Sequence, residues 1–195
     1  MNKLNNAINI ILQNLGEQTL GATEAIDGIF EAEQASLVLD EIKTQVLAFG
    51  YNFNTDKVWE FVPDMDGYIA IPDNALSVDP TDTGQDSVVK DHKLYNKDDV
   101  TYVFTSTVEA EVIWDVPFDD VPLIVQHYIV TRASRMLVQR LTGNETMLQY
   151  LLNDEEKAKV EVLNWDSDIG DYNVFDSSTT MRIINRTTNP RGLKG

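Results

Sequence analysis

The 195-residue chain contains no cysteine. Disulfides, thiolate zinc sites, iron–sulfur clusters and cysteine nucleophiles are therefore excluded, and the absence fits assembly in a reducing cytoplasm. No run approaches the roughly 20 uninterrupted apolar residues of a membrane-spanning helix. The N-terminus also lacks a cationic segment followed by an apolar block, so we expect neither a secretory signal nor membrane insertion.

Basic residues are few: 15 Lys and Arg stand against 32 Asp and Glu, for a net charge of −17. The imbalance is uneven, because residues 1–180 carry all 32 acids and 11 of the basic residues, whereas residues 181–195 carry four basic residues and no acid. The acidic body repels phosphate, which disfavours duplex binding. The basic end suits contact with nucleic acid or an acidic partner, or else a solvated terminus.

The common signatures of catalysis are also missing. The chain has no G-x-x-x-x-G-K-[ST], G-x-G-x-x-G or G-x-S-x-G segment. Residues 87–90 match S-x-x-K without its companion motifs. Residues 64–67 resemble the start of a calcium loop, but the twelfth position is Ala75 rather than glutamate, and residues 166–168 fail similarly. We interpret both acidic segments as polar turns.

Candidate acid–base residues are scarce or nonspecific. His92 and His127 are the only histidines. His92 is expected in a solvated turn and His127 at a packed or surface position of a helix. A Ser-His-Asp triad would therefore need residues from segments that are distant in the sequence. The 32 acids supply many carboxylate pairs for glycoside hydrolysis, so their abundance favours no particular pair. The residues therefore predict a non-enzymatic protein with no catalytic residue, metal or cofactor.

Helical periodicity marks the N-terminal quarter. Residues 3–15 place apolar side chains three and four apart and end before Gly16. A longer helix is predicted over residues 29–49, with Asp27 as the candidate N-cap and Gly50 as the stop. Its expected apolar face consists of Phe30, Leu37, Val38, Ile42, Val46 and Phe49.

From residue 57 to residue 114, the pattern of apolar residues changes from a helical period to an alternation of apolar and polar residues. Short strands are expected at residues 58–62, 68–71, 76–78, 87–95 (one or two strands around Asp91), 102–104 and 108–114. In the last of these, apolar residues alternate with Glu109 and Glu111. The pattern predicts a small antiparallel sheet or sandwich with one polar face.

A strong helical pattern, opened by Asp119 and Pro122, then continues to about residue 141, and Arg132, Arg135 and Gln139 share one of its faces. Its apolar stripe consists of Val121, Ile124, Val125, Tyr128, Ile129, Ala133, Met136 and Leu137.

Thr142 and Glu145 have the spacing of a capping box for a last helix that ends near residue 165. Its expected inward residues are Leu148, Leu151, Leu152, Ala158 and Val162. From Asp166 the periodicity is lost, and a segment of this composition is expected to be flexible alone and to order on a partner.

These patterns predict an α+β protein with a four-helix bundle-like lobe, an inserted small antiparallel β lobe and an extended tail. The predicted parts are an N-terminal helical pair at residues 1–55, the β insertion at 56–116, a second helical pair at 117–165 and the basic tail at 166–195.

Four segments resemble the tail tubular protein A family of short-tailed phages of the autographivirus type. They are the central helix with its FDDVP entry (residues 118–135), the opening helix with its Gly-Glu stop (7–17), the second helix with the aromatic turn after it (39–54), and residues 170–176. The central helix is the most specific, and the similarity extends over nearly the whole chain.

The resemblance implies a structural virion protein of the phage tail, assembled in the host cytoplasm. Members form a ring, usually a dodecamer, that joins the portal to the tail nozzle, a tail tubular protein B-like partner, with tail fibres nearby. Phage DNA leaves through the bore without specific binding. The family implies no metal and no cofactor.

Within this resemblance, seven residues are candidates for partner contacts. Arg132 and Arg135 are expected to pair with carboxylates within or between subunits, because a planar guanidinium binds a carboxylate through two hydrogen bonds. The contacts with a neighbouring copy or the portal are expected from Tyr172, Phe175, Arg182, Arg186 and Arg191.

Three other functions stay open on the sequence. One is a tail-associated polysaccharide hydrolase that uses an Asp/Glu pair. Another is a head-completion protein of a different phage type, with the same ring role and other partners. The third is an acidic binding protein of the host.

Overall fold

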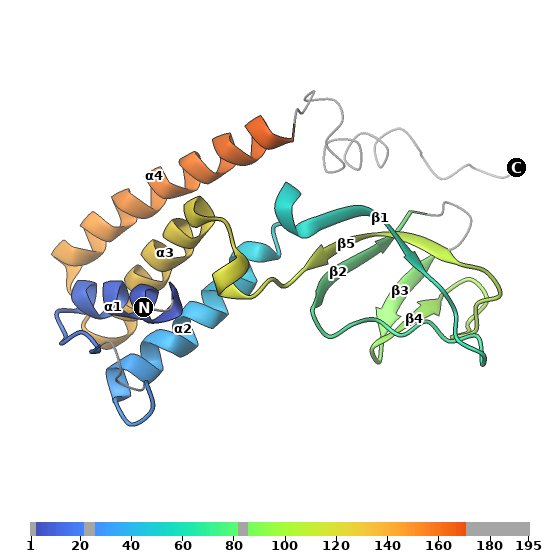
Figure 1. Ribbon diagram of the computed structural model, residues 1–195, viewed down its shortest axis with the longest axis horizontal. Coiled ribbons are helices and arrows are strands. Elements are labelled where there is room, and N and C mark those ends of the chain that lie inside the picture. Colours follow the sequence, from blue (N-terminus) through green and yellow to red (C-terminus); the bar gives the residue numbers. More distant parts are fainter. Residues whose placement is uncertain (1–2, 22–25, 82–85, 171–195) are drawn as a thin grey trace, which may run out of the picture.

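Four helices gather at one end of the described chain and five short strands at the other (Figure 1). The computed structural model describes residues 3–21, 26–81 and 86–170. The helices are α1 (Lys3–Leu15), α2 (Phe30–Leu47), α3 (Leu123–Leu141) and α4 (Glu145–Ile169). The strands are β1 (Thr55–Phe61), β2 (Ala75–Pro80), β3 (Ser87–Lys90), β4 (Lys93–Asn96) and β5 (Val108–Trp114), with short 3-10 turns at η1 (Asn52–Asn54) and η2 (Phe118–Asp120). The predicted α+β class is confirmed.

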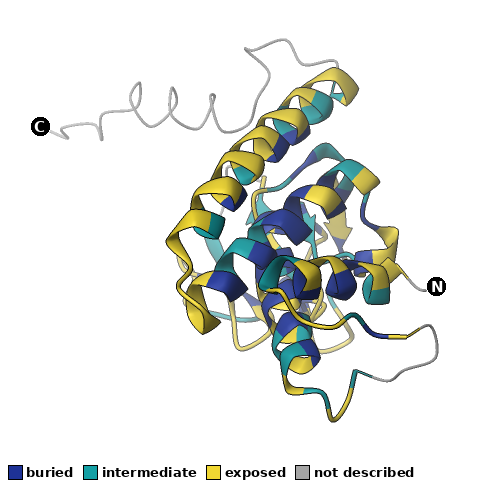
Figure 2. Ribbon diagram, turned by 90° about the vertical axis from the view of Figure 1, so that its left-hand side faces the viewer, coloured by how far each residue is buried: buried dark blue, intermediate teal, exposed yellow. Residues whose placement is uncertain are grey.

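Helix α3 is the centre of the helical end, because α1, α2 and α4 all pack on it. Its predicted apolar stripe is confirmed: Val125, Ile129, Ala133 and Leu137 are each at most 1% exposed. Helix α1 has the predicted bounds and turns its apolar face toward α2 and α3 (Figure 2). Burying an isoleucine or leucine side chain stabilises a fold by about 1.5–3 kcal/mol. Helices α1, α2 and α3 therefore form the main core.

Helix α4 is attached through one narrow face. Three of its 25 residues are buried, namely Leu151, Ala158 and Val162. Leu152 was expected inside, but it is 42% exposed. The helix also continues to Ile169 rather than ending near residue 165, so residues 166–168 are helical and the predicted polar turn is wrong.

Helix α2 carries apolar residues on two opposite faces. Part of its predicted face is confirmed by the buried residues Val38, Ile42 and Val46. The rest is wrong, because Phe30, Leu37 and Phe49 are 58%, 64% and 65% exposed. Residues follow one another at about 100° around a helix, which places Phe30 and Leu37 nearly opposite the buried face.

Two of the predicted helix caps are wrong. Ile29 rather than Asp27 is the N-cap of α2, and it makes no side-chain capping bond. Thr142 belongs to the end of α3, where its hydroxyl donates to the carbonyl of Val138, and the N-cap of α4 is Asn144. The predicted capping box is therefore absent.

The strands form two small antiparallel sheets, one with the order β1-β5-β2 and one made of the β3–β4 hairpin. Residues 87–95 thus contain two strands, joined by Asp91 and His92 with φ of 52° and 55°. Two successive residues with positive φ are what a tight hairpin turn requires. The strands predicted at 68–71 and 102–104 form isolated bridges instead.

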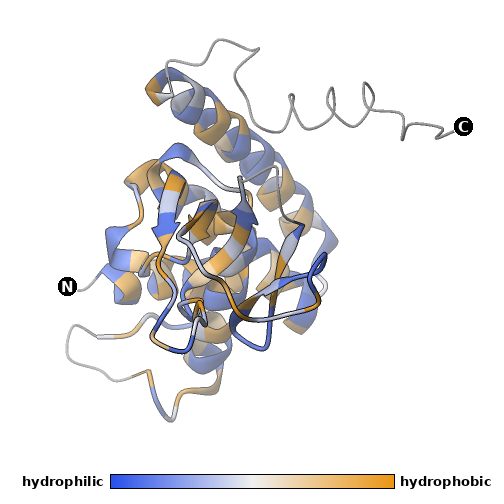
Figure 3. Cartoon of the chain, turned by 90° about the vertical axis from the view of Figure 1, so that its right-hand side faces the viewer, coloured by the Kyte–Doolittle hydropathy of each residue, from blue (hydrophilic) through white to orange (hydrophobic). Residues whose placement is uncertain are grey.

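Strand β5 lies between β1 and β2 and shows the predicted alternation. Val108, Ala110 and Val112 are buried while Glu109 is exposed, and polar and apolar residues alternate along this end of the molecule (Figure 3). A second hydrophobic cluster forms here, separate from that of the helices, from Phe61, Ile69, Ile71, Leu94, Phe104, Val108, Ala110 and Val112. The domain boundaries at residues 55/56, 116/117 and 165/166 stay a prediction.

A short polar junction links the last turn of α2 to the end of β5. Asn54 is 2% exposed, and its Nδ2 donates to the carbonyls of Leu47 (3.0 Å) and Trp114 (2.9 Å). Gly50 has a φ of +79°, and a Cβ there would lie 2.7 Å from a side-chain atom of Ile113. Helix α2 ends at Leu47, two residues before the predicted end, and Gly50 forms the turn after it and lets the chain pass close to β5.

An ion pair supports the same junction. Lys43 of α2 is buried, and its Nζ lies 3.1 Å from Asp40 and 3.2 Å from Asp115, just after β5. Burial lowers the pKa of Lys43, but the two carboxylates outweigh that effect and raise the pKa above its ordinary value. The ammonium therefore stays charged and bridges the two ends of the molecule.

Candidate functional site

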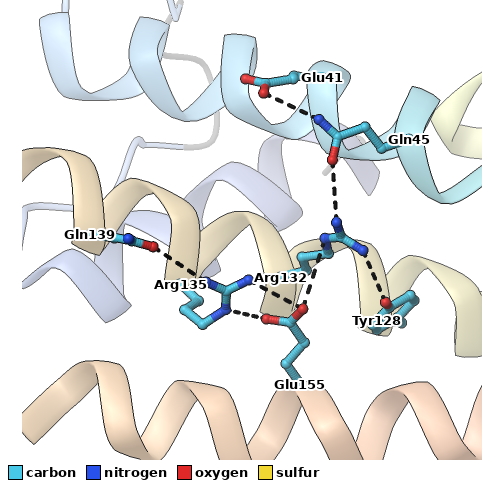
Figure 4. A network of polar contacts seen from close by, with 7 residues as sticks. All are labelled: Glu41, Gln45, Tyr128, Arg132, Arg135, Gln139 and Glu155. Carbon is cyan, nitrogen blue, oxygen red and sulfur yellow. Dashed lines mark hydrogen bonds and ion pairs between the residues drawn. The ribbon is translucent and has the colours of Figure 1, made fainter.

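Two arginines of α3 meet one glutamate of α4 in a half-buried cluster (Figure 4). Arg135 donates through Nε and Nη2 to the carboxylate of Glu155, the second bond at 3.4 Å. Arg132 Nε lies 3.8 Å from the same carboxylate. We call these three residues the arginine cluster. Since Arg132 and Arg135 are three positions apart, one face of α3 presents both.

The arginine cluster extends toward α2 through neutral partners. Arg132 donates from Nη1 to the Tyr128 hydroxyl (3.2 Å) and from Nη2 to the Gln45 side chain of α2 (3.3 Å). Arg135 donates to Gln139 (3.4 Å). The cluster therefore links α2, α3 and α4.

The cluster carries more positive than negative charge. Two guanidinium groups share the single carboxylate of Glu155, whose side chain is 12% exposed. Arg132 Nε is buried and makes no hydrogen bond to any residue that the structure describes. Polar donors left in this state favour an additional acceptor. Chemically, the cluster can hold helices together and bind an anion.

The predicted pairing of Arg132 and Arg135 with a carboxylate occurs here within one chain. Their role at an interface with another subunit stays a prediction. The other five candidates lie outside the described residues, namely Tyr172, Phe175, Arg182, Arg186 and Arg191.

Glu155 is not among the site residues predicted from the sequence, although its position in the pattern of α4 indicates a buried acid. Glu155 falls on the inward stripe of α4, four residues after Leu151 and three before Ala158. An acid on an apolar stripe needs a buried cation, because an unpaired buried charge is costly. The two arginines of the preceding helix are the cations that this rule requires.

The C-terminal end of α4 has its own attachment to the turn after α2. Asn52 donates from its backbone N–H (2.8 Å) and its side chain (3.0 Å) to Asp166. Phe53 packs against Trp165 with ring centroids 6.1 Å apart, and also stacks on Tyr51 at 5.9 Å. These contacts hold residues 165 and 166 of α4 against the turn after α2.

Tyr51 in this turn is expected to titrate late. Burial, with smaller contributions from Tyr128 and Asp166 and an opposing one from Arg132, raises its pKa from 10.0 to about 12. Because folding favours the neutral phenol, its contribution to stability is complete below pH 10 and is lost as the pH rises toward 12. Ultraviolet titration should show a late step in tyrosine ionisation that is smaller by one tyrosine in Tyr51→Phe. An equal late step in the titrations of the original chain and of Tyr51→Phe would contradict this expectation.

Within the described part of the chain, no group of three or more acidic or histidine side chains is placed to hold a metal ion. His92 lies in the exposed hairpin turn, 3.3 Å from the exposed Asp73, and His127 is exposed on α3. The Asp64 carboxylate accepts the backbone N–H groups of Asp66 (3.0 Å) and Tyr68 (2.8 Å), which confirms a polar turn. Among the same residues, no helix is long and apolar enough to cross a membrane.

A family model described as "Tail tubular protein" matches residues 5–172, which span both ends of the described structure. The chain belongs to the tail tubular protein family. It is also similar to tail tubular protein A of Klebsiella phage KP34, with 27% identity over 159 residues, covering 80% of this chain and 83% of the relative. The resemblance found in the sequence is confirmed.

Membership in the tail tubular protein family makes this chain a structural component of a phage tail. The arginine cluster lies inside the matched residues, whereas Arg182, Arg186 and Arg191 lie beyond them. The predicted contacts of these three arginines therefore depend on the charge pattern of this chain alone.

Proposed function

We propose that copies of this tail tubular protein form a ring that joins the portal of the phage head to the tail nozzle, and that DNA leaves through its bore. The observation that carries the proposal is the family match over residues 5–172, which includes both the helical and the β end. The portal, a tail tubular protein B-like nozzle and nearby tail fibres are the proposed partners. Twelve copies is the proposed number, and assembly is proposed to occur in the host cytoplasm.

The physical properties of the chain support this proposal. A closed ring needs two different faces on each copy, and an elongated molecule with dissimilar ends and sides can supply them (Figure 1). Residues 1–180 carry 32 acids against 11 basic residues, so a bore lined by them would not retain DNA. Passage of DNA without specific binding follows from this repulsion.

Mixing with the portal tests the proposal directly. The purified full chain is incubated with the portal ring from the same genome, and the products are weighed by mass photometry and imaged by electron microscopy. We expect a second ring on one end of the portal, with a mass that gives the copy number. A correctly assembled portal that gains no ring would contradict the proposal, and a sugar-release assay would then test the hydrolase alternative.

Removal of residues 176–195 is expected to leave a folded protein that no longer docks on the portal. These residues contain Arg182, Arg186 and Arg191, which the acidic body cannot replace. The melting temperature of the truncated chain should match that of the full chain, since the removed residues lie outside the described helices and strands. Docking at full strength after truncation would show that the basic end is dispensable.

A further inference from the structure

Helix α2 presents a row of side chains that points away from its own core. Phe30 and Leu37 are 58% and 64% exposed and lie seven residues apart. Residues at spacings of four and three stay within about 80° of one another around a helix. We call this row the α2 seam, and it consists of Phe30, Gln34, Leu37, Glu41, Thr44 and Ala48.

Helix α4 presents a second row with the same spacing on its side away from α3. Tyr150 and Val160 of this row are 65% and 56% exposed. We call it the α4 seam, and it consists of Thr146, Tyr150, Asn153, Lys157, Val160 and Asn164. Both seams span 19 residues, which corresponds to about 27 Å of helix.

Ten of the twelve side chains in the two seams are exposed, and the seams belong to helices that pack on α3 from different sides (Figures 1 and 2). The exposed apolar side chains of the seams, Phe30 and Leu37 on α2 and Tyr150 and Val160 on α4, favour a partner that covers them. Heterologous contacts in a ring require two different surfaces on each copy, and the two seams meet that requirement.

The charges of the two seams are complementary. The charged residues of α2 are four acids and Lys43, which is buried on the inward face. The α4 seam contains Lys157 and no acid, although α4 as a whole is acidic. Two α2 seams facing each other would bring acids together, whereas an α2 seam facing an α4 seam pairs opposite charges.

The direction of α2 and α4 is also compatible with contact between the α2 seam of one copy and the α4 seam of the next. Helices α2 and α4 run the same way, opposite to α3 (Figure 1). Neighbouring copies in a twelve-membered ring differ by a rotation of about 30°, so the α2 of one copy and the α4 of the next stay close to parallel. In a parallel alignment the fourth residues of the two seams, Glu41 and Lys157, lie side by side. Each also has a partner in its own chain: Arg140 donates two hydrogen bonds to Glu41 (2.8 and 2.9 Å), and Lys157 Nζ lies 3.5 Å from Asp154. The exposed Lys157–Asp154 pair is weak. The Glu41 carboxylate has lone pairs to spare, so it can keep its bonds to Arg140 while it faces Lys157.

We propose that the α2 seam of one copy packs against the α4 seam of the next copy around the ring. This inference rests on the proposed ring function and specifies which surfaces meet in it. The occupant of each seam is a second copy of this chain.

Because the chain has no cysteine, single cysteines report this contact without background. Leu37→Cys chains are mixed with Asn153→Cys chains, assembled on the portal and treated with a short bismaleimide. We expect a cross-linked dimer in the mixture and none with either variant alone. A chain carrying both substitutions should give a ladder of products up to the whole ring. The matched control pairs Asn153→Cys with Val62→Cys, an exposed position of the β end, and should give no dimer.

Three outcomes overturn the inference while leaving the ring function intact, provided that electron microscopy shows the ring in the same sample. These are no dimer in the mixture, dimers of Leu37→Cys alone, and a cross-link from Leu37→Cys to the portal. Absence of any ring overturns the proposed function and this inference together. As a second measurement, Leu37→Glu should weaken association of neighbouring copies about tenfold or more, whereas Val62→Glu should leave it unchanged.

Discussion

Replacing Asn54 with alanine is expected to lower the free energy of unfolding by about 2–4 kcal/mol, because three backbone groups each lose a hydrogen bond from this buried side chain. Asn54 donates to the carbonyls of Leu47 and Trp114, and its Oδ1 accepts the backbone N–H of Tyr51 at 2.9 Å. Alanine can satisfy none of them, and the site is 2% exposed, so water replaces these bonds poorly. The substitution should also weaken the connection between the helical and β ends.

Equilibrium denaturation followed by tryptophan fluorescence measures this loss. Trp114 lies at the end of β5 and Trp165 near the end of α4, so the signal reports both ends of the molecule. Asn153→Ala is the matched control, because that asparagine is exposed on α4, and its effect should stay within about 0.5 kcal/mol. A loss below 1 kcal/mol for Asn54→Ala would show that the junction does not depend on this side chain.

Replacing Glu155 with alanine is expected to cost about 2–4 kcal/mol and to loosen α4 from α3. Removing Glu155 takes the carboxylate partner from two half-buried guanidinium groups, those of Arg132 and Arg135, which is costly where water reaches them poorly. Helix α4 has little else to retain it, since three of its residues are buried. Amide hydrogen exchange should therefore speed up in α4 more than in α1, α2 or α3.

The shared carboxylate predicts an order among related variants. Arg135→Ala should cost less than Glu155→Ala, because Arg132 remains to pair with the carboxylate. Lys97→Ala should cost about 0–1 kcal/mol, because Lys97 forms an exposed pair with Asp86. Equal losses for Glu155→Ala and Lys97→Ala in thermal denaturation would show that the arginine cluster contributes no more than a surface ion pair.

The spacing of apolar residues was sufficient to predict a helix or strand wherever that element has one buried side. The bounds of α1, the apolar stripe of α3 and the alternation of β5 all follow from the sequence, because a period of 3.6 or 2 identifies a single inward face. The turn at Gly50 followed as well, since a positive φ favours glycine. The class of the fold and the family resemblance rest on these features.

The spacing of apolar residues did not predict the structure correctly where a helix has apolar residues on two sides. It also failed where a contact joins segments that are distant in the sequence. Phe30 and Leu37 form a second apolar face of α2 opposite its buried residues, so the sequence alone cannot tell which face meets α3. The end of α4 at Ile169 depends on Asn52, more than 100 residues earlier in the chain.

By itself, then, the sequence determined the order of helices and strands, the acidic body with its basic end, and the family. Tertiary structure alone decided which face of α2 is inward, that Glu155 is shared by two arginines, and that Asn54 joins α2 to β5. The physical reason is that periodicity and composition are properties of neighbouring residues, whereas burial and ion pairing depend on what the rest of the chain brings to each side.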